Sequence, residues 1–150
     1  MQQTRIQVQT ENFDQNAIYQ WLSEHHSVGA TTIFVGKVRE MNLGDSVSGL
    51  FLEHYPAMTE KALAEIVAEA RSRWDLQRVA VIHRIGQLST GDEIVLVGVS
   101  SVHRGDAYAA NEFMMDYLKT RAPFWKRERT DQGERWIEGR ESDQQAAAKW

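Results

Sequence analysis

The sequence contains no cysteine and only two prolines among its 150 residues. The absence of cysteine excludes disulfide bonds, cysteine-ligated zinc, iron–sulfur clusters and a thiol nucleophile. A reaction of this protein that involves sulfur would therefore have to receive the sulfur from a partner. No apolar run approaches the roughly 18 residues of a membrane-spanning helix, so we expect no membrane segment. The first residues lack the apolar stretch of a secretory signal, and we expect a cytoplasmic protein.

Several chemical signatures are also missing. The sequence has no HExxH pattern and no acidic cluster with metal-ligand spacing, so we predict no metal site. It has no glycine-rich dinucleotide loop, P-loop or GxSxG motif, and we predict no bound cofactor. We interpret His25, His26, His54 and His83 as structural or surface residues rather than ligands.

The length and composition are those of one globular unit. The chain is 42% hydrophobic and 25% charged, which is ordinary for a folded protein of this size. Since it shows no internal repeat and no linker-like stretch, we predict a single domain over residues 1–150.

Hydrophobic periodicity predicts the elements of this domain. The predicted strands cover residues 5–8, 28–35, 49–55, 78–85 and 93–102, with a final hairpin from 124–129 and 135–137. The predicted helices cover residues 14–23, 59–74 and 106–121. Asn12 is the expected cap of the first helix and Thr59 of the second. The uninterrupted apolar run over residues 94–99 predicts a strand that is covered on both faces.

Two segments lack a clear period. Residues 37–48 contain Gly44-Asp45-Ser46 and predict a loop. The tail 141–150 is polar and rich in alanine, and we expect it to become ordered against another chain. Two long helices and at least four strands that do not strictly alternate predict an α+β fold, with the helices packed on the sheet.

Positive charge is concentrated in residues 119–129. This segment holds five basic residues, one acidic residue, two aromatic residues and a proline. Its net charge is +4, and because the whole chain carries −4, the rest carries −8. Such a concentration on an acidic protein predicts a site for a small anion rather than for a long polyanion.

Lys119 and Lys126 are the candidate reactive groups of this segment. Lys119 ends the third predicted helix, and Lys126 follows Pro123, which breaks that helix. If the chain folds back at Pro123, both amines face one pocket, and mutual repulsion with partial burial lowers a lysine pKa. A lysine so tuned acts as a general acid or base, or as a nucleophile. The alternative is a pair of solvated cations.

Two further basic motifs end strands. His103-Arg104 opens the third helix, whose N-terminus suits phosphate. The alternative is a pair that caps this helix and bridges to Asp106 or Glu112. Gly36-Lys37-Val38-Arg39 ends another strand, and its glycine lets a ligand come close.

Taken in order, several motifs resemble the large, catalytic subunit of molybdopterin synthase. They are Gly36-Lys37-Val38-Arg39, Leu52-Glu53-His54-Tyr55-Pro56 with Met58, His83-Arg84-Ile85-Gly86, Val102-His103-Arg104, and Met115-Asp116-Tyr117-Leu118-Lys119 through Pro123-Phe124-Trp125-Lys126-Arg127-Glu128. The resemblance runs from about Ile6 to the tail and covers nearly the whole chain.

This resemblance implies an α/β-hammerhead fold and a homodimer at the centre of a heterotetramer. The family's small subunit is a ubiquitin-like sulfur carrier with a C-terminal thiocarboxylate, and its tail enters a pocket of the large subunit. Two sulfur transfers there convert cyclic pyranopterin monophosphate into molybdopterin, whose dithiolene later holds molybdenum. The implied activity is that of a sulfurtransferase in molybdenum cofactor biosynthesis.

The resemblance also implies roles for individual residues. Lys119 activates the substrate or attacks the carbon that bears the thiocarboxylate, and Lys126 binds charge and assists. The implied substrate-binding residues are Lys37, Val38, Arg39, His103, Arg104, Arg127, Glu128 and Arg140. In such a dimer Arg39 is a candidate to serve the pocket of the other protomer.

Two other functions fit parts of the sequence. A nucleic-acid-binding module would use Phe124 and Trp125 to stack bases. The acidic remainder of the chain argues against an extended nucleic-acid footprint, and we predict no such partner. A non-catalytic pterin-phosphate binder would keep the arginines but tolerate the loss of Lys119.

Overall fold

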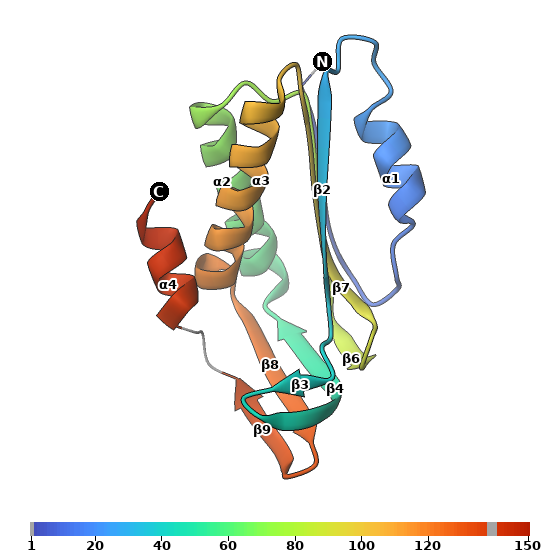
Figure 1. Cartoon of the computed structure of the whole chain (residues 1–150), viewed down its shortest axis with the longest axis vertical. Helices are drawn as coiled ribbons and strands as arrows, with labels where there is room; N and C mark the ends of the chain where they lie inside the picture. Colours follow the sequence, from blue (N-terminus) through green and yellow to red (C-terminus); the bar gives the residue numbers. More distant parts are fainter. Residues whose placement is uncertain (1, 138–140) are drawn as a thin grey trace.

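The computed structural model describes residues 2–137 and 141–150, which form helices around two β-sheets (Figure 1). The helices are α1 (Gln15–Leu22), α2 (Pro56–Arg73), α3 (Arg104–Arg121) and α4 (Glu141–Ala148). The strands are β1 (Gln3–Gln9), β2 (Ala30–Lys37), β3 (Met41–Asn42), β4 (Asp45–His54), β5 (Arg78–Arg84), β6 (Gly86–Ser89), β7 (Glu93–Ser101), β8 (Phe124–Thr130) and β9 (Gly133–Ile137).

The first sheet has the strand order β1-β5-β7-β2. Its β1–β5 pair is parallel and its other two pairs are antiparallel. Helices α2 and α3 lie on one face of this sheet and α1 lies on the other (Figure 1). This arrangement confirms the predicted α+β fold, in which two long helices pack on a mostly antiparallel sheet.

Strand β7 forms the centre of the core. Its residues from Val95 to Ser101 are all buried, because helices cover both faces, as the sequence predicts. Val97 belongs to the larger core beneath α2 and α3, and Leu96 to the smaller core beneath α1. At Gly98 a Cβ atom would lie 2.5 Å from Cδ1 of Leu22, so only glycine lets α1 come this close.

The second sheet has the order β3-β4-β8-β9, with β6 paired to the other edge of β4. It lies at the end of the molecule where β2 and α3 both end (Figure 1). Its apolar residues form a separate cluster made of Val38, Val47, Leu50, Leu52 and Leu88. The chain reaches this sheet twice near the same place, through Val38 after β2 and through Pro123 after α3.

The two expected helix caps were wrong. Helix α1 is capped by Asp14, whose side chain accepts a hydrogen bond from the Ala17 N–H at 3.1 Å. Asn12 instead bonds the N–H of Phe13 and the carboxylate of Glu93. Either residue type is a good cap, so the spacing alone did not decide between them.

Helix α2 begins one turn before the predicted start. Pro56 occupies the first turn, where its missing N–H costs nothing, and Tyr55 is the cap residue. Thr59 is buried inside the first turn. Its hydroxyl accepts from the Tyr55 N–H at 3.2 Å and donates to the Pro123 carbonyl at 3.1 Å. Thr59 therefore ties the start of α2 to the Pro123 break.

Two segments without a sequence period are ordered, contrary to prediction. Within the expected loop, β3 and β4 form a hairpin around Leu43 and Gly44, whose φ angles are 52° and 80°. Two positive φ angles are what a primed two-residue turn requires. The tail forms α4 and packs on α3 of the same chain, where Trp150 lies against Phe113 with ring centroids 5.7 Å apart.

Candidate active site

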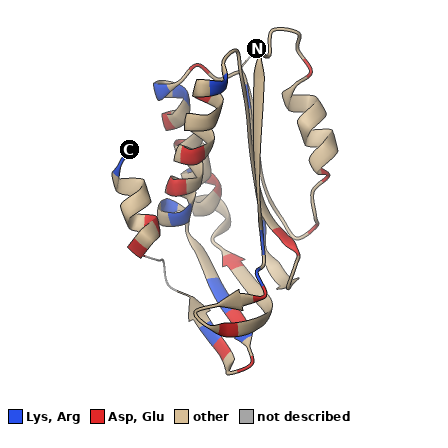
Figure 2. Ribbon diagram, viewed as in Figure 1, with Lys and Arg blue, Asp and Glu red and all other residues tan. Residues whose placement is uncertain are grey.

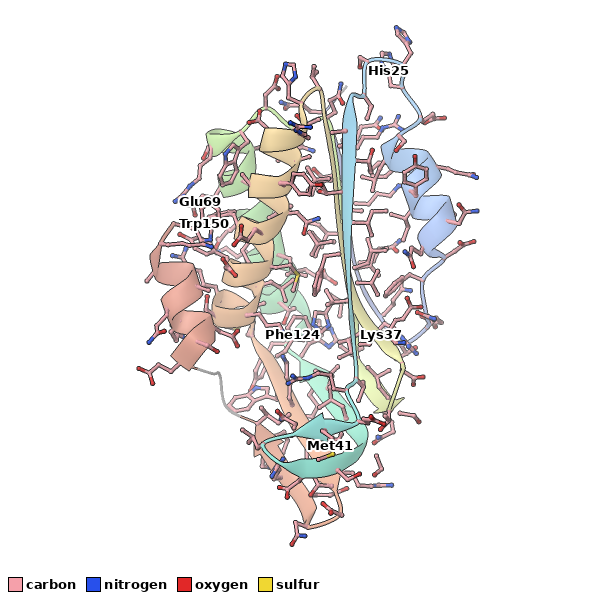
Figure 3. The ribbon with its side chains drawn as sticks, in the orientation of Figure 1. His25, Lys37, Met41, Glu69, Phe124 and Trp150 are labelled. Atoms are coloured by element: carbon pink, nitrogen blue, oxygen red, sulfur yellow. The ribbon has the colours of Figure 1, made fainter. Side chains whose placement is uncertain are left out.

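A pocket of about 600 Å³ lies where the two sheets meet the end of α3. Its wall is built from segments far apart in the sequence: the end of β2, the β3–β4 hairpin, β5, the end of α3, β8 and α4. Six of the predicted site residues line it, namely Lys37, Val38, Arg39, Lys119, Lys126 and Glu128. Figure 3 shows Lys37 and Phe124 at the same level between the helices and the second sheet.

Lys119 and Lys126 enter this pocket from two elements. Helix α3 ends at Arg121, and the chain turns at Pro123 into β8. Alternation along β8 then places Phe124, Lys126 and Glu128 on the pocket side of the strand. The break at Pro123 therefore brings together two amines that are seven positions apart in the sequence. Figure 2 shows basic residues at this end of α3 and on β8.

The pocket lowers the pKa of Lys126 to about 8. Burial is the main cause, because a half-buried ammonium loses hydration, and the positive charge of Lys119 adds to it. The carboxylate of Asp143 on α4 acts in the opposite direction. Lys126 therefore exchanges its proton much closer to neutral pH than an ordinary lysine does.

The end of β2 supplies the other cations. Lys37 and Arg39 are exposed and lie on either side of Val38, which is buried. The backbone of Val38 is held in place, since its N–H donates to the Asp92 carbonyl at 2.8 Å and its carbonyl accepts from the Gly91 N–H at 2.8 Å. Val38 thus anchors the segment, while Lys37 and Arg39 carry its charge.

Glu128 is only 3% exposed and is already bonded within the chain. The side-chain amide of Asn42 donates to its two oxygens at 2.8 and 3.1 Å, and Arg135 Nε donates to it at 3.4 Å. These bonds fix the carboxylate in the pocket wall, and the positive charge of Arg135 offsets part of its negative charge.

Three of the predicted site residues, Arg127, His103 and Arg104, do not join this group, and a fourth, Arg140, is not described. Arg127 lies on the other face of β8, where its guanidinium is 5.2 Å from the Phe51 ring and 5.5 Å from the Trp136 ring. Its Nε lies 3.7 Å from Glu134. Arg140 lies outside the residues that the structure describes.

His103 and Arg104 lie at the opposite end of α3 from Lys119. The helix has 18 residues, so at about 1.5 Å per residue the two ends are about 27 Å apart. Both side chains are exposed, and His103 makes no side-chain capping bond. Within one chain, these residues therefore cannot share the pocket with the lysines.

Three residues that sequence reasoning missed also line the pocket: His83, Asn42 and Asp143. His83 ends an apolar strand and is 2% exposed. A histidine at the end of a buried strand was a usable signal. Asn42 lies in a segment predicted to be a loop, and Asp143 lies in the tail, so the local sequence indicated neither.

No metal site emerges from the described residues. Residues 2–137 and 141–150 contain no group of three or more His, Cys, Asp or Glu side chains that could hold a metal ion. No helix in this part of the chain is long and apolar enough to cross a membrane.

Comparison with known proteins gives one family. Residues 8–121 match the family described as "MoaE protein". A molybdopterin synthase catalytic subunit of Haemophilus ducreyi is 80% identical over 150 residues, covering 100% of this chain and 99% of the relative. The protein of the same description from Escherichia coli is 63% identical and is covered completely. The chain therefore belongs to the MoaE family.

Solved structures agree with the fold. A molybdopterin biosynthesis MoaE protein from Burkholderia ambifaria matches with a TM-score of 0.84 and 49% identity, covering 99% of this chain and 98% of that one. A molybdopterin synthase from Staphylococcus aureus matches with a TM-score of 0.81 and 35% identity, covering 87% of this chain and 95% of that one.

Proposed function

We propose that this chain is the catalytic subunit of a molybdopterin synthase. It transfers sulfur from the C-terminal thiocarboxylate of a small ubiquitin-like subunit to cyclic pyranopterin monophosphate, and two transfers form the dithiolene of molybdopterin. The observation that carries the proposal is the pair Lys119 and Lys126, which line one pocket from two elements joined at Pro123. Relatives described as catalytic subunits of this enzyme support the reaction class.

The two lysines suit different parts of the reaction. Lys126 is half-buried with a pKa of about 8, so it binds charge and transfers a proton near neutral pH. Lys119 is exposed at the edge of the pocket, where it can meet the carboxyl end of the partner. Lys37 and Arg39 supply positive charge for the phosphate of the substrate.

The size and composition of the pocket fit two reactants. A volume of about 600 Å³ lies within the usual range for small-molecule sites. Because the chain contains no cysteine, it cannot carry the sulfur as a persulfide or thiolate, and the sulfur has to arrive on the partner's tail. The pocket therefore has to admit a peptide end as well as a pterin.

In this proposal His103 and Arg104 serve the pocket of a second copy of the chain. Their distance from Lys119 along α3 rules out a shared pocket within one copy. In a two-fold symmetric dimer whose copies meet antiparallel, the start of an element in one copy lies near the end of the same element in the other copy. His103 and Arg104 of the partner subunit would then add positive charge opposite Arg39.

The edge of the first sheet offers a way to form this dimer. Strand β2 is an edge strand, and Phe34 on it is 41% exposed. Its first residue, Ala30, pairs with Ser101, two residues before His103. If two β2 edges pair antiparallel about a two-fold axis, the start of one strand lies beside the end of the other, near Lys37. In that arrangement the partner's His103 would lie beside the pocket.

A single-turnover assay tests the proposed function. The purified chain is mixed with thiocarboxylated small subunit and cyclic pyranopterin monophosphate, and dithiolene product is followed by mass spectrometry. We expect product with the wild-type chain and none with Lys119→Ala. The matched control is Lys61→Ala, because Lys61 is a solvent-exposed lysine on α2.

Two results of this assay would contradict the proposal. If the wild-type chain binds the small subunit and yields no product, the chain is a binding protein and not the catalytic subunit. If Lys119→Ala keeps wild-type activity, Lys119 has no chemical role. A cytoplasmic location remains a prediction from the sequence, and cell fractionation tests it.

A further inference from the structure

Asn42 connects two charged groups of the pocket wall. Nη2 of Arg39 donates to Oδ1 of Asn42 at 3.3 Å. On its other side, Nδ2 of Asn42 donates to both oxygens of Glu128, at 2.8 and 3.1 Å. The carboxamide is therefore oriented by its neighbours, with its amide nitrogen toward the carboxylate and its oxygen toward the guanidinium.

Burial and further hydrogen bonds hold the Glu128 carboxylate that accepts from Asn42 in place. It is buried, and it also accepts a hydrogen bond from Nε of Arg135 at 3.4 Å. Arg135 in turn bonds Asp45 at 2.6 Å and the backbone carbonyl of Asn42 at 2.9 Å. Both the side chain and the backbone of Asn42 are thus tied to the same network on β4, β8 and β9.

The hairpin turn sets the direction in which Asn42 points. The turn residues Leu43 and Gly44 both have positive φ, and a leucine in this conformation is strained by about 1 kcal/mol. Leu43 is 74% exposed, so packing of its side chain does not offset this strain. The bonds of Asn42 and Asp45, on either side of the turn, hold the strained backbone in place.

We propose that Asn42 is a positioning residue, which holds the Arg39 guanidinium toward the anionic group of the substrate. This inference rests on the proposed function, in which Arg39 binds the substrate phosphate. Arg39 is exposed and its long side chain has many rotamers, so a tether to the rigid network reduces the ordering cost of binding. Within residues 2–137 and 141–150, the side-chain bond to Asn42 uses one of the five N–H groups of the guanidinium, and the anion is bound through the others.

The neutral charge of Asn42 is as important as its hydrogen bonds. A carboxylate at this position would pair with Arg39 and compete with the substrate for its charge. It would also lie beside Glu128 and repel it. An amide satisfies both neighbours and leaves the positive charge of Arg39 uncompensated.

A double-mutant cycle tests the inference. We expect Asn42→Ala to raise the KM for cyclic pyranopterin monophosphate about tenfold and to change kcat less than about threefold. In an Arg39→Ala background, Asn42→Ala should cause no further rise, because it acts through Arg39. Equal effects in both backgrounds would overturn the inference, since a role in hairpin stability does not depend on Arg39.

Two further variants separate charge from structure. Asn42→Asp should raise KM more than Asn42→Ala, because the new carboxylate competes for Arg39. Met41→Ala is the control, since Met41 lies in the same strand, is 49% exposed and does not line the pocket. An Asn42→Asp chain with a lower KM than Asn42→Ala would contradict the proposed mechanism.

The same cycle can be measured without sulfur transfer. Inorganic phosphate is titrated into the wild-type chain and the three cycle variants, and its dissociation constant is followed by NMR. We expect weaker phosphate binding in Asn42→Ala only when Arg39 is present. If this holds while the assay yields no product, the proposed function fails and the positioning role stands. Equal phosphate affinity in wild type and Asn42→Ala would overturn the positioning role.

Discussion

The imidazole of His83 lies flat on the ring of Phe124, with ring centroids 3.8 Å apart and an interplanar angle of 17°. Nδ1 of His83 lies 2.8 Å from the Arg84 carbonyl oxygen, and because a carbonyl only accepts, Nδ1 carries the proton. Burial lowers the pKa of His83 to about 3, and the charges of Lys126 and Lys119 add to the effect. This wall of the pocket therefore stays neutral beside the two lysines.

The first prediction is that His83 makes the protein sensitive to acid. The unfolded chain takes up the His83 proton near the ordinary pKa of 6.5, whereas the folded chain takes it up near 3. Between these values the unfolded state binds one more proton, so the free energy of unfolding falls by about 1.4 kcal/mol for each unit that the pH falls. His83→Phe keeps a ring on Phe124 and removes this titration. Urea unfolding at a series of pH values gives the free energy of unfolding as a function of pH. Between about pH 3 and 6.5 this free energy should fall less steeply with falling pH in His83→Phe than in wild type. An unchanged slope would assign the acid sensitivity to other groups.

The elements of the fold were largely predictable because their signals are local. The apolar run of β7 and the helical spacing of α2 and α3 each lie within one segment, and Pro123 marks the end of α3 in the sequence itself. The β3–β4 hairpin was not predictable in this way. Leu43 is an unusual residue for a positive φ, so the turn resembled a loop, and its stability comes from Asn42 and Asp45 bonding to distant strands.

The site residues likewise differ in whether the local sequence indicates them. Lys119 and Lys126 were recognisable because a helix break lies between them in the sequence. Their surroundings come from distant segments: the Asp143 carboxylate that acts on Lys126 comes from the tail, and His83, which lines the same pocket, comes from β5. The position of His103 and Arg104 at the far end of α3 follows from helix length, and only a second copy of the chain explains a role for them in the pocket.

The second prediction concerns the proton of Lys126. The Asp143 carboxylate stabilises the Lys126 ammonium, so Asp143→Asn should lower the pKa of Lys126 further below its ordinary value. The limb of the pH profile of kcat/KM that Lys126 controls should move to lower pH. Glu141→Gln, a neighbouring exposed carboxylate on α4, is the control. A shift to higher pH in Asp143→Asn would show that Asp143 does not act on this lysine through its charge.

The third prediction is that Trp150 fastens α4 to the body of the protein. The centroids of the Trp150 and Trp74 rings are 5.6 Å apart. Nε1 of Trp150 donates a hydrogen bond to the Asp116 carboxylate at 2.6 Å, and Arg73 donates one to the backbone carbonyl of Trp150 at 2.7 Å. Trp150→Ala should lower the free energy of unfolding by about 2–3 kcal/mol, since both packing and a charge-assisted hydrogen bond are lost.

Trp150→Phe separates the two contributions. It keeps an aromatic ring and loses the bond to Asp116, so its cost should be about 1 kcal/mol. Gln145→Ala, at an exposed position on α4, should stay within about 0.5 kcal/mol of wild type. The measurement is urea unfolding followed by tryptophan fluorescence and by circular dichroism. Equal stability of Trp150→Ala and wild type would mean that Trp150 does not fasten α4 to the body of the protein.

The fourth prediction tests whether one pocket uses residues of two protomers. Lys119→Ala and Arg104→Ala should each be inactive as homodimers, for lack of a reactive amine and of a phosphate-binding cation. In a mixed dimer, one pocket combines both defects, and the other combines the intact Lys119 of one protomer with Arg104 of the partner subunit. Random mixing should therefore restore about a quarter of the wild-type activity, because half of the dimers are mixed and each has one complete pocket.

The alternative arrangement gives a different number. If Lys119 and Arg104 served the same pocket within one protomer, every pocket in the mixture would carry one defect and no activity would return. The variants are co-expressed with different affinity tags, and the mixed dimer is isolated through both tags before the single-turnover assay. Arg129→Ala replaces Arg104→Ala as the control partner, since Arg129 is an exposed arginine that does not line the pocket. The isolated mixed dimer of Lys119→Ala and Arg129→Ala should keep about half of the wild-type activity, because one of its two pockets is intact. If the pocket is shared between protomers, the isolated mixed dimer of Lys119→Ala and Arg104→Ala should reach the same value.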